Sequence, residues 1–353
     1  MRARITGVWL ALAGCAGSQG PAAEGPTGGA PAAMPGPARG RKADAVRENA
    51  ACVGCHAAAA TEWRASLHAR ANVEPTYRRA FAIEPLPFCR GCHAPEADPF
   101  EPESADVSAL GVACVTCHVT DGGVLAAPRT DGHDDARAPH AITRDARFAS
   151  RAACASCHEF AFPTALARPT RSAGDMMQTT AIEHAASPAA STSCAECHMP
   201  RDGGRARSHA FVASRDAATV KRAVAVRATR TGPSTARIEL TPRAPGHAFP
   251  TGDLFRRVEV LAEATGPDTM VLGREARYLT RHFEPRRSGQ GQRLLRDDRV
   301  MFETVHVDLD VGVAAPISWR VAYQRVEHPS GADDGDAALD GEIVLGEGVL
   351  PID

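Results

Sequence analysis

The sequence predicts an α+β protein in which a mostly α-helical and irregular domain, residues 44–216, precedes an antiparallel β-sandwich, residues 217–353. Two observations support this division. Five C-x-x-C-H motifs lie in the first part, where long regular elements are scarce. After about residue 217, apolar and polar residues alternate strictly, which is typical of half-buried β-strands. A chain of 353 residues has room for both domains.

The N-terminus is typical of an exported lipoprotein. Two arginines precede a short apolar run, residues 5–12, which cannot span a membrane. Residues 12–15, Leu-Ala-Gly-Cys, resemble the lipobox of bacterial lipoproteins. The resemblance implies that residues 1–14 are a signal peptide, that Cys15 carries lipid, and that Ala16 directs the protein to the periplasmic face of the outer membrane or the cell surface. An ordinary cleaved signal with an incidental cysteine is the alternative.

Residues 15–43 are rich in Gly, Ala and Pro and contain almost no large apolar side chains. Such a composition cannot bury enough surface to fold, so we expect a disordered linker. The linker would act as a flexible tether between the anchor and the first domain.

The five motifs predict covalent haem attachment. In C-x-x-C-H, two thiols add to the vinyl groups of one haem and the histidine is the proximal iron ligand. The first to fifth motifs are Cys52-Cys55-His56, Cys89-Cys92-His93, Cys114-Cys117-His118, Cys154-Cys157-His158 and Cys194-Cys197-His198. Disulfides or zinc sites would leave the repeated histidine unexplained. Thioredoxin-like motifs occur singly on a βαβ background, which is absent here. The sequence therefore predicts five covalently bound haem c groups.

Aromatic residues make up only 5% of the chain, so we expect the porphyrins themselves to fill much of the interior of the first domain. Folding of this domain should then depend on the cofactor, as it does in small metal-dependent domains. The clearest predicted helix is residues 61–71, in which Trp63, Leu67 and His68 recur at helical spacing. The net charge of −2, without a basic cluster, argues against nucleic-acid binding.

Three sequence strings resemble the cytochrome c-554 superfamily of multihaem cytochromes. They are Glu-Trp-Arg-Ala-Ser-Leu-His-Ala at residues 62–69, Cys-Ala-Glu-Cys-His-Met-Pro at 194–200 followed by His-Ala-Phe at 209–211, and Gly-His-Ala-Phe-Pro-Thr-Gly at 246–252. The resemblance implies that His68, His209 and His247 are distal haem ligands. His140, a short distance after the third motif, resembles another ligand position.

The fifth distal ligand is open on the sequence alone. His184 is the first candidate, on a predicted helix, and His133 in an Asp/Gly-rich loop is a weaker one. A thioether from Met176 or Met177 would raise the potential of that haem, although packing is the simpler role for methionine.

The second domain should contain several amphipathic strands. Val305, Val307 and Leu309 alternate with polar residues that include His306, and residues 317–323 form the clearest strand. We expect His282, His306 and His328 at the surface. Arg256 and Arg257 could pair with haem propionates or be ordinary surface arginines. The acidic loop 333–336 is interpreted as solvated rather than as a calcium site.

These features predict an electron carrier rather than an enzyme: a relay of mostly bis-histidine haems that exchanges electrons with redox protein partners and contacts the membrane through Cys15. The alternative is an oxidoreductase that acts on a small nitrogen or sulfur compound at one five-coordinate haem. A scaffold role for the β-sandwich is compatible with the relay. The chain lacks the C-x-x-C-K motif that is typical of many pentahaem nitrite reductases. Tyr77 is the only tyrosine in the haem region, so a tyrosine-crosslinked haem is not expected.

Overall fold

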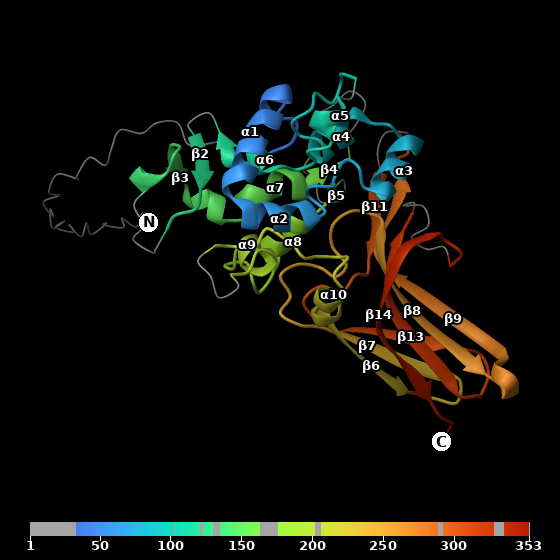
Figure 1. The fold of residues 1–353 in the computed structure, drawn as a ribbon. Helices are drawn as coiled ribbons and strands as arrows, with labels where there is room; N and C mark the ends of the chain where they lie inside the picture. The colour runs from blue at the N-terminus through green and yellow to red at the C-terminus, as the bar shows by residue number, and fades with distance from the viewer. Residues whose placement is uncertain are drawn as a thin grey trace, which may run out of the picture. The chain divides into compact units, whose positions relative to one another are not determined.

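Short helices carry the motifs of the first domain (Figure 1). The computed structural model describes residues 33–102, 104–120, 123–129, 135–162, 176–201, 206–288, 292–327 and 335–352. The helices are α1 (Lys42–Cys55), α2 (Ala57–Ala65), α3 (Pro75–Ile83), α4 (Pro87–His93), α5 (Ala105–Ser108), α6 (Cys114–His118), α7 (Ala152–His158), α8 (Thr180–Ala186), α9 (Cys194–His198) and α10 (Ala217–Ala223). Each motif forms the last turn of its helix, where spacing of three residues brings both thiols to one side.

The predicted helix 61–71 is wrong at both ends, because α2 begins at Ala57 and stops at Ala65. Ser66 ends the helix by turning to extended backbone, and its hydroxyl donates to the carbonyl of Trp63 at 2.7 Å. His68 therefore lies in a run of turns after the helix rather than on it.

The predicted linker also ends too late. The segment Met34–Arg41 packs on the motif helices: the Ser156 hydroxyl donates to the carbonyl of Pro35 at 2.5 Å, and the Ala38 amide donates to Gly91 at 2.7 Å. Ser156 and Gly91 are the variable residues of the fourth and second motifs. The composition did not predict that this segment is ordered, because backbone groups rather than large apolar side chains hold it in place.

Arg41 completes the attachment of this segment to the third motif. Its guanidinium makes two bonds of 2.9 Å to the buried carboxylate of Glu96, which also accepts from Thr116 at 2.9 Å. We call Met34–Arg41 the N-terminal strap. The predicted signal peptide, the predicted lipidation site Cys15, His133, His328 and Asp333–Asp334 lie outside the described residues.

Small sheets join the helices of the first domain. β1 (Val119–Thr120), β2 (Gly123–Ala126) and β3 (Ile142–Arg144) form one sheet in which β1 and β2 are antiparallel and β2 and β3 are parallel. β4 (Phe160–Ala161) pairs with β5 (Met176–Gln178), so the methionines considered as ligands lie on a strand.

The second domain contains two antiparallel sheets that face each other across an apolar core. One sheet has the order β12 (Val305–Asp310), β7 (Thr235–Pro242), β6 (Val224–Arg230). The other has the order β14 (Leu339–Leu350), β13 (Ile317–Val326), β8 (Arg256–Thr265), β9 (Val271–Leu279). A separate hairpin pairs β10 (Arg281–Pro285) with β11 (Gln292–Asp297). The α+β prediction is confirmed.

The core of the β-sandwich follows the predicted alternation. In β12, Val307 and Leu309 are buried in the cluster between the sheets, whereas the side chain of His306 is 50% exposed, as expected. The prediction for His282 is wrong: its side chain is buried and its Nε2 contacts Asp298 at 3.0 Å. Its exposure was expected only because no sequence context set it apart from surface residues, and a single histidine carries no pattern that predicts burial.

The two predicted domains do not separate, because residues 32–353 form one compact unit. Ion pairs tie α3 to β14: Asp340 accepts from Thr76 and pairs with Arg215 at 2.9 Å and with Arg325 at 3.2 Å. Glu74, which caps α3, pairs with the same Arg215 at 2.7 Å. In the part of the chain that is described, no helix is long and apolar enough to cross a membrane.

Candidate functional site

The proximal histidines are oriented through their Nδ1 atoms. Nδ1 of His93 lies 2.7 Å from the carbonyl oxygen of Ala71, that of His118 lies 2.9 Å from Leu125, and that of His198 lies 3.1 Å from Val212. A carbonyl oxygen can only accept, so Nδ1 carries the proton and the lone pair of Nε2 stays available for a metal. In His158, Nδ1 contacts Oε1 of Gln178 at 3.1 Å. Such outer contacts are typical of metal-binding imidazoles.

Four proximal histidines each lie opposite one of the histidines proposed as a distal ligand. The distances between ring centroids are 6.5 Å for His56–His140, 6.2 Å for His68–His158, 6.2 Å for His118–His209 and 6.1 Å for His198–His247. None of these partners is a sequence neighbour of its motif, so the fold alone brings them together.

The spacing of these pairs fits a shared iron. Two imidazoles that bind one metal on opposite sides, with metal–nitrogen bonds of about 2.0 Å, have ring centroids roughly 6.3 Å apart. Direct packing of two rings can also give such distances, but it would not recur at four of five motifs. The ten motif cysteines form no disulfides with one another, so their thiols are available for thioether bonds.

Burial keeps the histidines in the protonation state that a metal requires. It lowers the pKa of His68 to about 4, helped by the nearby His158 and His198, and it also lowers the pKa values of His118 and His247. A neutral imidazole is the form that binds iron, so these histidines need not lose a proton first.

The string at residues 62–69 positions two of the histidines predicted to be distal ligands. The carboxylate of Glu62 accepts from the backbone amide of His209 at 2.6 Å, and the indole of Trp63 donates to the carbonyl of Val112 at 2.8 Å. The amide of Val112 in turn donates to the carbonyl of His68 at 2.8 Å. The resemblance pointed to the histidines, whereas the positioning roles of Glu62 and Trp63 became clear only from the structure.

Gly111 allows the chain to pass close to His68. Its φ is +56°, and an added Cβ would lie 2.4 Å from the carbonyl oxygen of His68. Phe211 also contacts this region, because its ring meets those of His68 and His209 at centroid distances of 4.4 and 5.9 Å. The turn that carries His68 is therefore fixed on two sides.

The second motif differs from the other four. The ring that packs against His93 is that of Tyr77, which is parallel to it at 3.8 Å and so covers the face of the imidazole. Within the described ranges, no histidine ring forms a comparable pair with His93.

His184 is buried, its Nδ1 has no hydrogen-bond partner, and it lies within electrostatic range of His247. The structure does not bring His184 to a proximal ring.

Thiols of different motifs lie close together. Cys92 of the second motif and Cys194 of the fifth each form a thiol contact with a cysteine of the fourth, Cys157 and Cys154 respectively. Cys117 of the third motif is also within electrostatic range of the fourth. The third motif reaches the first in the same way, through Cys114 and Cys52. The first motif is therefore close to the third, and the third is close to the fourth. The second and fifth motifs both contact the fourth.

The two arginines after the Gly-His-Ala-Phe-Pro-Thr-Gly string have different surroundings. Arg257 is buried, donates to Gln324 at 2.8 Å and stacks on the ring of Tyr278, so it is not a surface residue. It was misassigned because β8 is a central strand with both faces covered. Arg256 pairs with Asp253 at 2.7 Å and lies within electrostatic range of His158.

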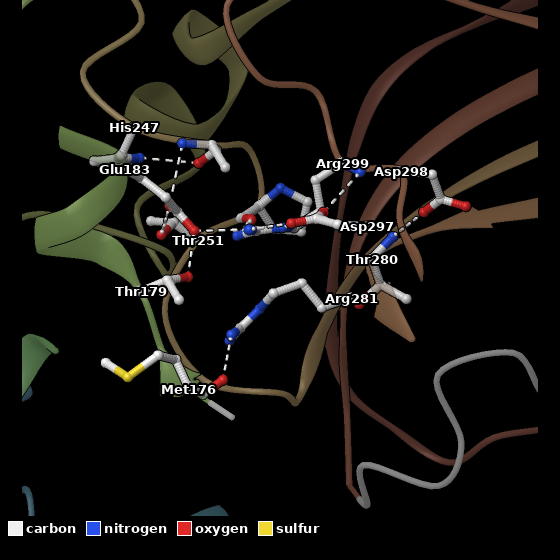
Figure 2. A network of polar contacts seen from close by, with 12 residues as sticks. Met176, Thr179, Glu183, His247, Thr251, Thr280, Arg281, Asp297, Asp298 and Arg299 are labelled. Atoms are coloured by element: carbon white, nitrogen blue, oxygen red, sulfur yellow. Dashed lines mark hydrogen bonds and ion pairs between the residues drawn. The ribbon is translucent and has the colours of Figure 1, made fainter. Parts of the chain in front are cut away.

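A buried polar network joins this string to both domains (Figure 2). Its centre is the ion pair between Glu183 of α8 and Arg299, with side chains 5% and 4% exposed and an N–O distance of 2.7 Å. Arg281 adds bonds to the carbonyls of Met176 and Gly252 at 2.9 and 3.0 Å. Sequence reasoning missed these residues, because an isolated Glu or Arg carries no pattern that predicts burial.

Residues 51–119 match the family model described as cytochrome c554 and c-prime. Over this stretch the chain is similar to that family of c-type cytochromes. The matched residues contain the first three motifs and the Glu62–Ala69 string.

The chain is similar over most of its length to a solved structure. A penta-heme cytochrome c552 from Thermochromatium tepidum superposes with a TM-score of 0.65, covering 90% of this chain and 100% of that chain at 17% identity. At this identity the likeness shows the fold. A comparison with curated proteins gives no match.

Proposed function

We propose that the cytochrome is a pentahaem electron relay in which four haems have two histidine ligands each. The observation that carries this proposal is the set of four histidine pairs with ring centroids 6.1–6.5 Å apart. His140, His68, His209 and His247 are then the distal ligands of the first, fourth, third and fifth motifs, respectively.

Haem iron supplies reversible one-electron chemistry, and its ligands decide whether bond chemistry is also possible. Two histidines leave no coordination position open, so these four sites exchange electrons only. Histidine in place of methionine keeps their potentials low. The contacts between thiols of neighbouring motifs support transfer along one connected array, with the fourth motif as its meeting point.

We further propose that the cytochrome is exported and anchored by lipid at Cys15, on the periplasmic face of the outer membrane or at the cell surface, where it meets redox protein partners. The lipobox-like residues 12–15 support this location. Labelling with a radioactive fatty acid in a bacterial host tests it: the native chain should be labelled and the Cys15→Ala variant should not. An unlabelled native chain would exclude the anchor.

A second candidate function rests on the second motif. His93 has a stacked tyrosine rather than an opposing histidine among the described residues, so the iron held there is the place for an open coordination position. Such a position could bind a small nitrogen or sulfur compound. Asp253 lies within electrostatic range of both His93 and His158, which gives this region a carboxylate. Burial alone would raise the pKa of Asp253, but Arg256 outweighs it and lowers the pKa.

Haem counting and carbon monoxide binding distinguish the two functions. The holoprotein should contain five haems per chain, and the His→Ala change in any of the five motifs should remove or perturb one. If carbon monoxide leaves the reduced spectrum unchanged, every iron has two strong ligands and only the relay stands. If one haem per chain reacts, nitrite and hydroxylamine turnover should then be measured. Reaction of several haems would contradict the proposed histidine pairs.

A further inference from the structure

A buried carboxylate accepts two hydrogen bonds from the loop that carries His247. Oε2 of Glu183 accepts from the amide of Ala248 at 3.2 Å and from the hydroxyl of Thr251 at 2.6 Å. Ala248 and Thr251 both belong to the Gly-His-Ala-Phe-Pro-Thr-Gly string. Glu183 belongs to α8 in the haem domain, so a side chain of one domain fixes a loop of the other.

The bond to Ala248 bears directly on the His247 ring. The carbonyl of the same Ala248 residue lies 2.9 Å from Nδ1 of His247. Glu183 therefore holds the residue that orients the imidazole, and the oriented imidazole directs Nε2 away from this contact. The ring planes of His247 and His198 are within 10° of parallel, which is the smallest angle among the four histidine pairs.

Arg299 fixes the carboxylate and the loop together (Figure 2). It pairs with Glu183 and with Asp297, each at 2.7 Å, and donates to the carbonyl of Pro250 at 3.1 Å. Burial alone would raise the pKa of Glu183, but Arg299 and two threonine hydroxyls outweigh it and lower the pKa. Glu183 is therefore ionised, and an ionised buried pair is costly to separate.

We propose that Glu183 and Arg299 are positioning residues that set the orientation of the His247 imidazole at the fifth haem. The proposal rests on the proposed ligation of that haem by His198 and His247. It makes the β-sandwich a structural part of the fifth haem site, because the distal ligand depends on an ion pair between the domains.

The Glu183→Gln variant of the holoprotein tests this inference. Glutamine has one acceptor oxygen where the carboxylate has two, so it cannot hold the loop on one side and accept from Thr179 and Arg299 on the other. It also removes one of the two negative charges that face Arg299. The low-spin electron paramagnetic resonance (EPR) signal of a bis-histidine haem depends on the angle between the imidazole planes. We expect Glu183→Gln to shift or remove the one signal that His247→Ala abolishes, and to let up to one haem per chain bind carbon monoxide.

Two controls separate positioning from stability. Glu259→Gln alters a different buried carboxylate, in the β-sandwich, which accepts from Gln324 at 3.1 Å and from Arg320 at 3.2 Å rather than from residues of the string. It should lower the melting temperature without changing any haem signal. Thr251→Val removes one bond to Glu183 and keeps the ion pair, so it should shift the same signal, and Thr251→Ser should restore it. If the Glu183→Gln protein does not accumulate, the comparison of Thr251→Val with Thr251→Ser tests the proposal instead.

Two results would overturn the proposal, and they differ in what they exclude. If His247→Ala abolishes one signal while Glu183→Gln and Thr251→Val leave it intact, His247 is a ligand but Glu183 only stabilises the fold. If His247→Ala changes no haem signal, His247 is not a ligand, and the proposed coordination of the fifth motif fails together with the inference.

Discussion

Replacement of Gly111 by alanine should open the haem of the fourth motif. The added Cβ would lie 2.4 Å from the carbonyl oxygen of His68 and 2.7 Å from that of Ala69, whereas ordinary contacts are 3.4–4 Å. Because both neighbours are backbone atoms, the turn that carries His68 must move by about 1 Å, and metal–ligand distances tolerate only about 0.2 Å. The left-handed conformation adds a cost of about 1–2 kcal/mol for any residue with a Cβ.

Gly312→Ala is the matched control for this prediction. Gly312 also has a positive φ, +74°, but an added Cβ would meet nothing within 4 Å. Both variants should lower the melting temperature, and only Gly111→Ala should let one haem per chain bind carbon monoxide, as His68→Ala does. If Gly111→Ala and Gly312→Ala behave alike while His68→Ala opens a haem, the close packing of Gly111 does not hold the ligand and our reasoning is refuted.

Three further predictions concern ligation and pH. The ring planes of the histidine pair at the fourth motif are 67° apart, whereas those at the fifth are nearly parallel. The fourth motif should therefore give the more anisotropic low-spin EPR signal. Replacing the proposed distal histidine of each motif with alanine should assign the signals. His184→Ala should leave the visible spectrum and the haem count unchanged; loss of one low-spin haem would show that His184 is a ligand after all. The pKa of Asp340 is lowered, because its hydrogen bonds and ion pairs outweigh the effect of burial. Its contribution to stability is therefore fully present above its ordinary pKa of about 4. That contribution is lost as the pH falls through the pKa of the folded state. The difference in melting temperature between the native chain and Asp340→Asn should therefore shrink on acidification below about pH 4, and a difference independent of pH would contradict this.

The proximal half of each haem site could be predicted from the sequence, because thiol spacing and the adjacent histidine are local requirements. The distal half could be predicted only where a string resembled a known family, as for His68, His209 and His247. Which motif each of them serves depends on tertiary structure: His140 follows the third motif in sequence but lies opposite His56 of the first.

The fold was predictable where side-chain periodicity controls it. The strands around Val307 and Leu309 follow alternation, since one face of each packs on the other sheet. The N-terminal strap was missed because its contacts come from backbone carbonyls and from Arg41, which a composition argument cannot detect. The burial of Glu183 and Arg299 was also beyond the sequence, since each is stable in the interior only because of the other.

With the proposed coordination, the histidine pairs would also act as cross-links within the chain. Each iron would join two stretches of chain that are far apart in sequence, from His56 to His140 and from His198 to His247. A link that closes a long loop removes conformational freedom from the unfolded chain, as a disulfide does. The motif thiols would here bind the cofactor instead of forming disulfides. A protein with so few aromatic side chains would thus gain rigidity from bonds to metal. Reagents that displace histidine from iron should then destabilise the whole chain as well as change its visible spectrum.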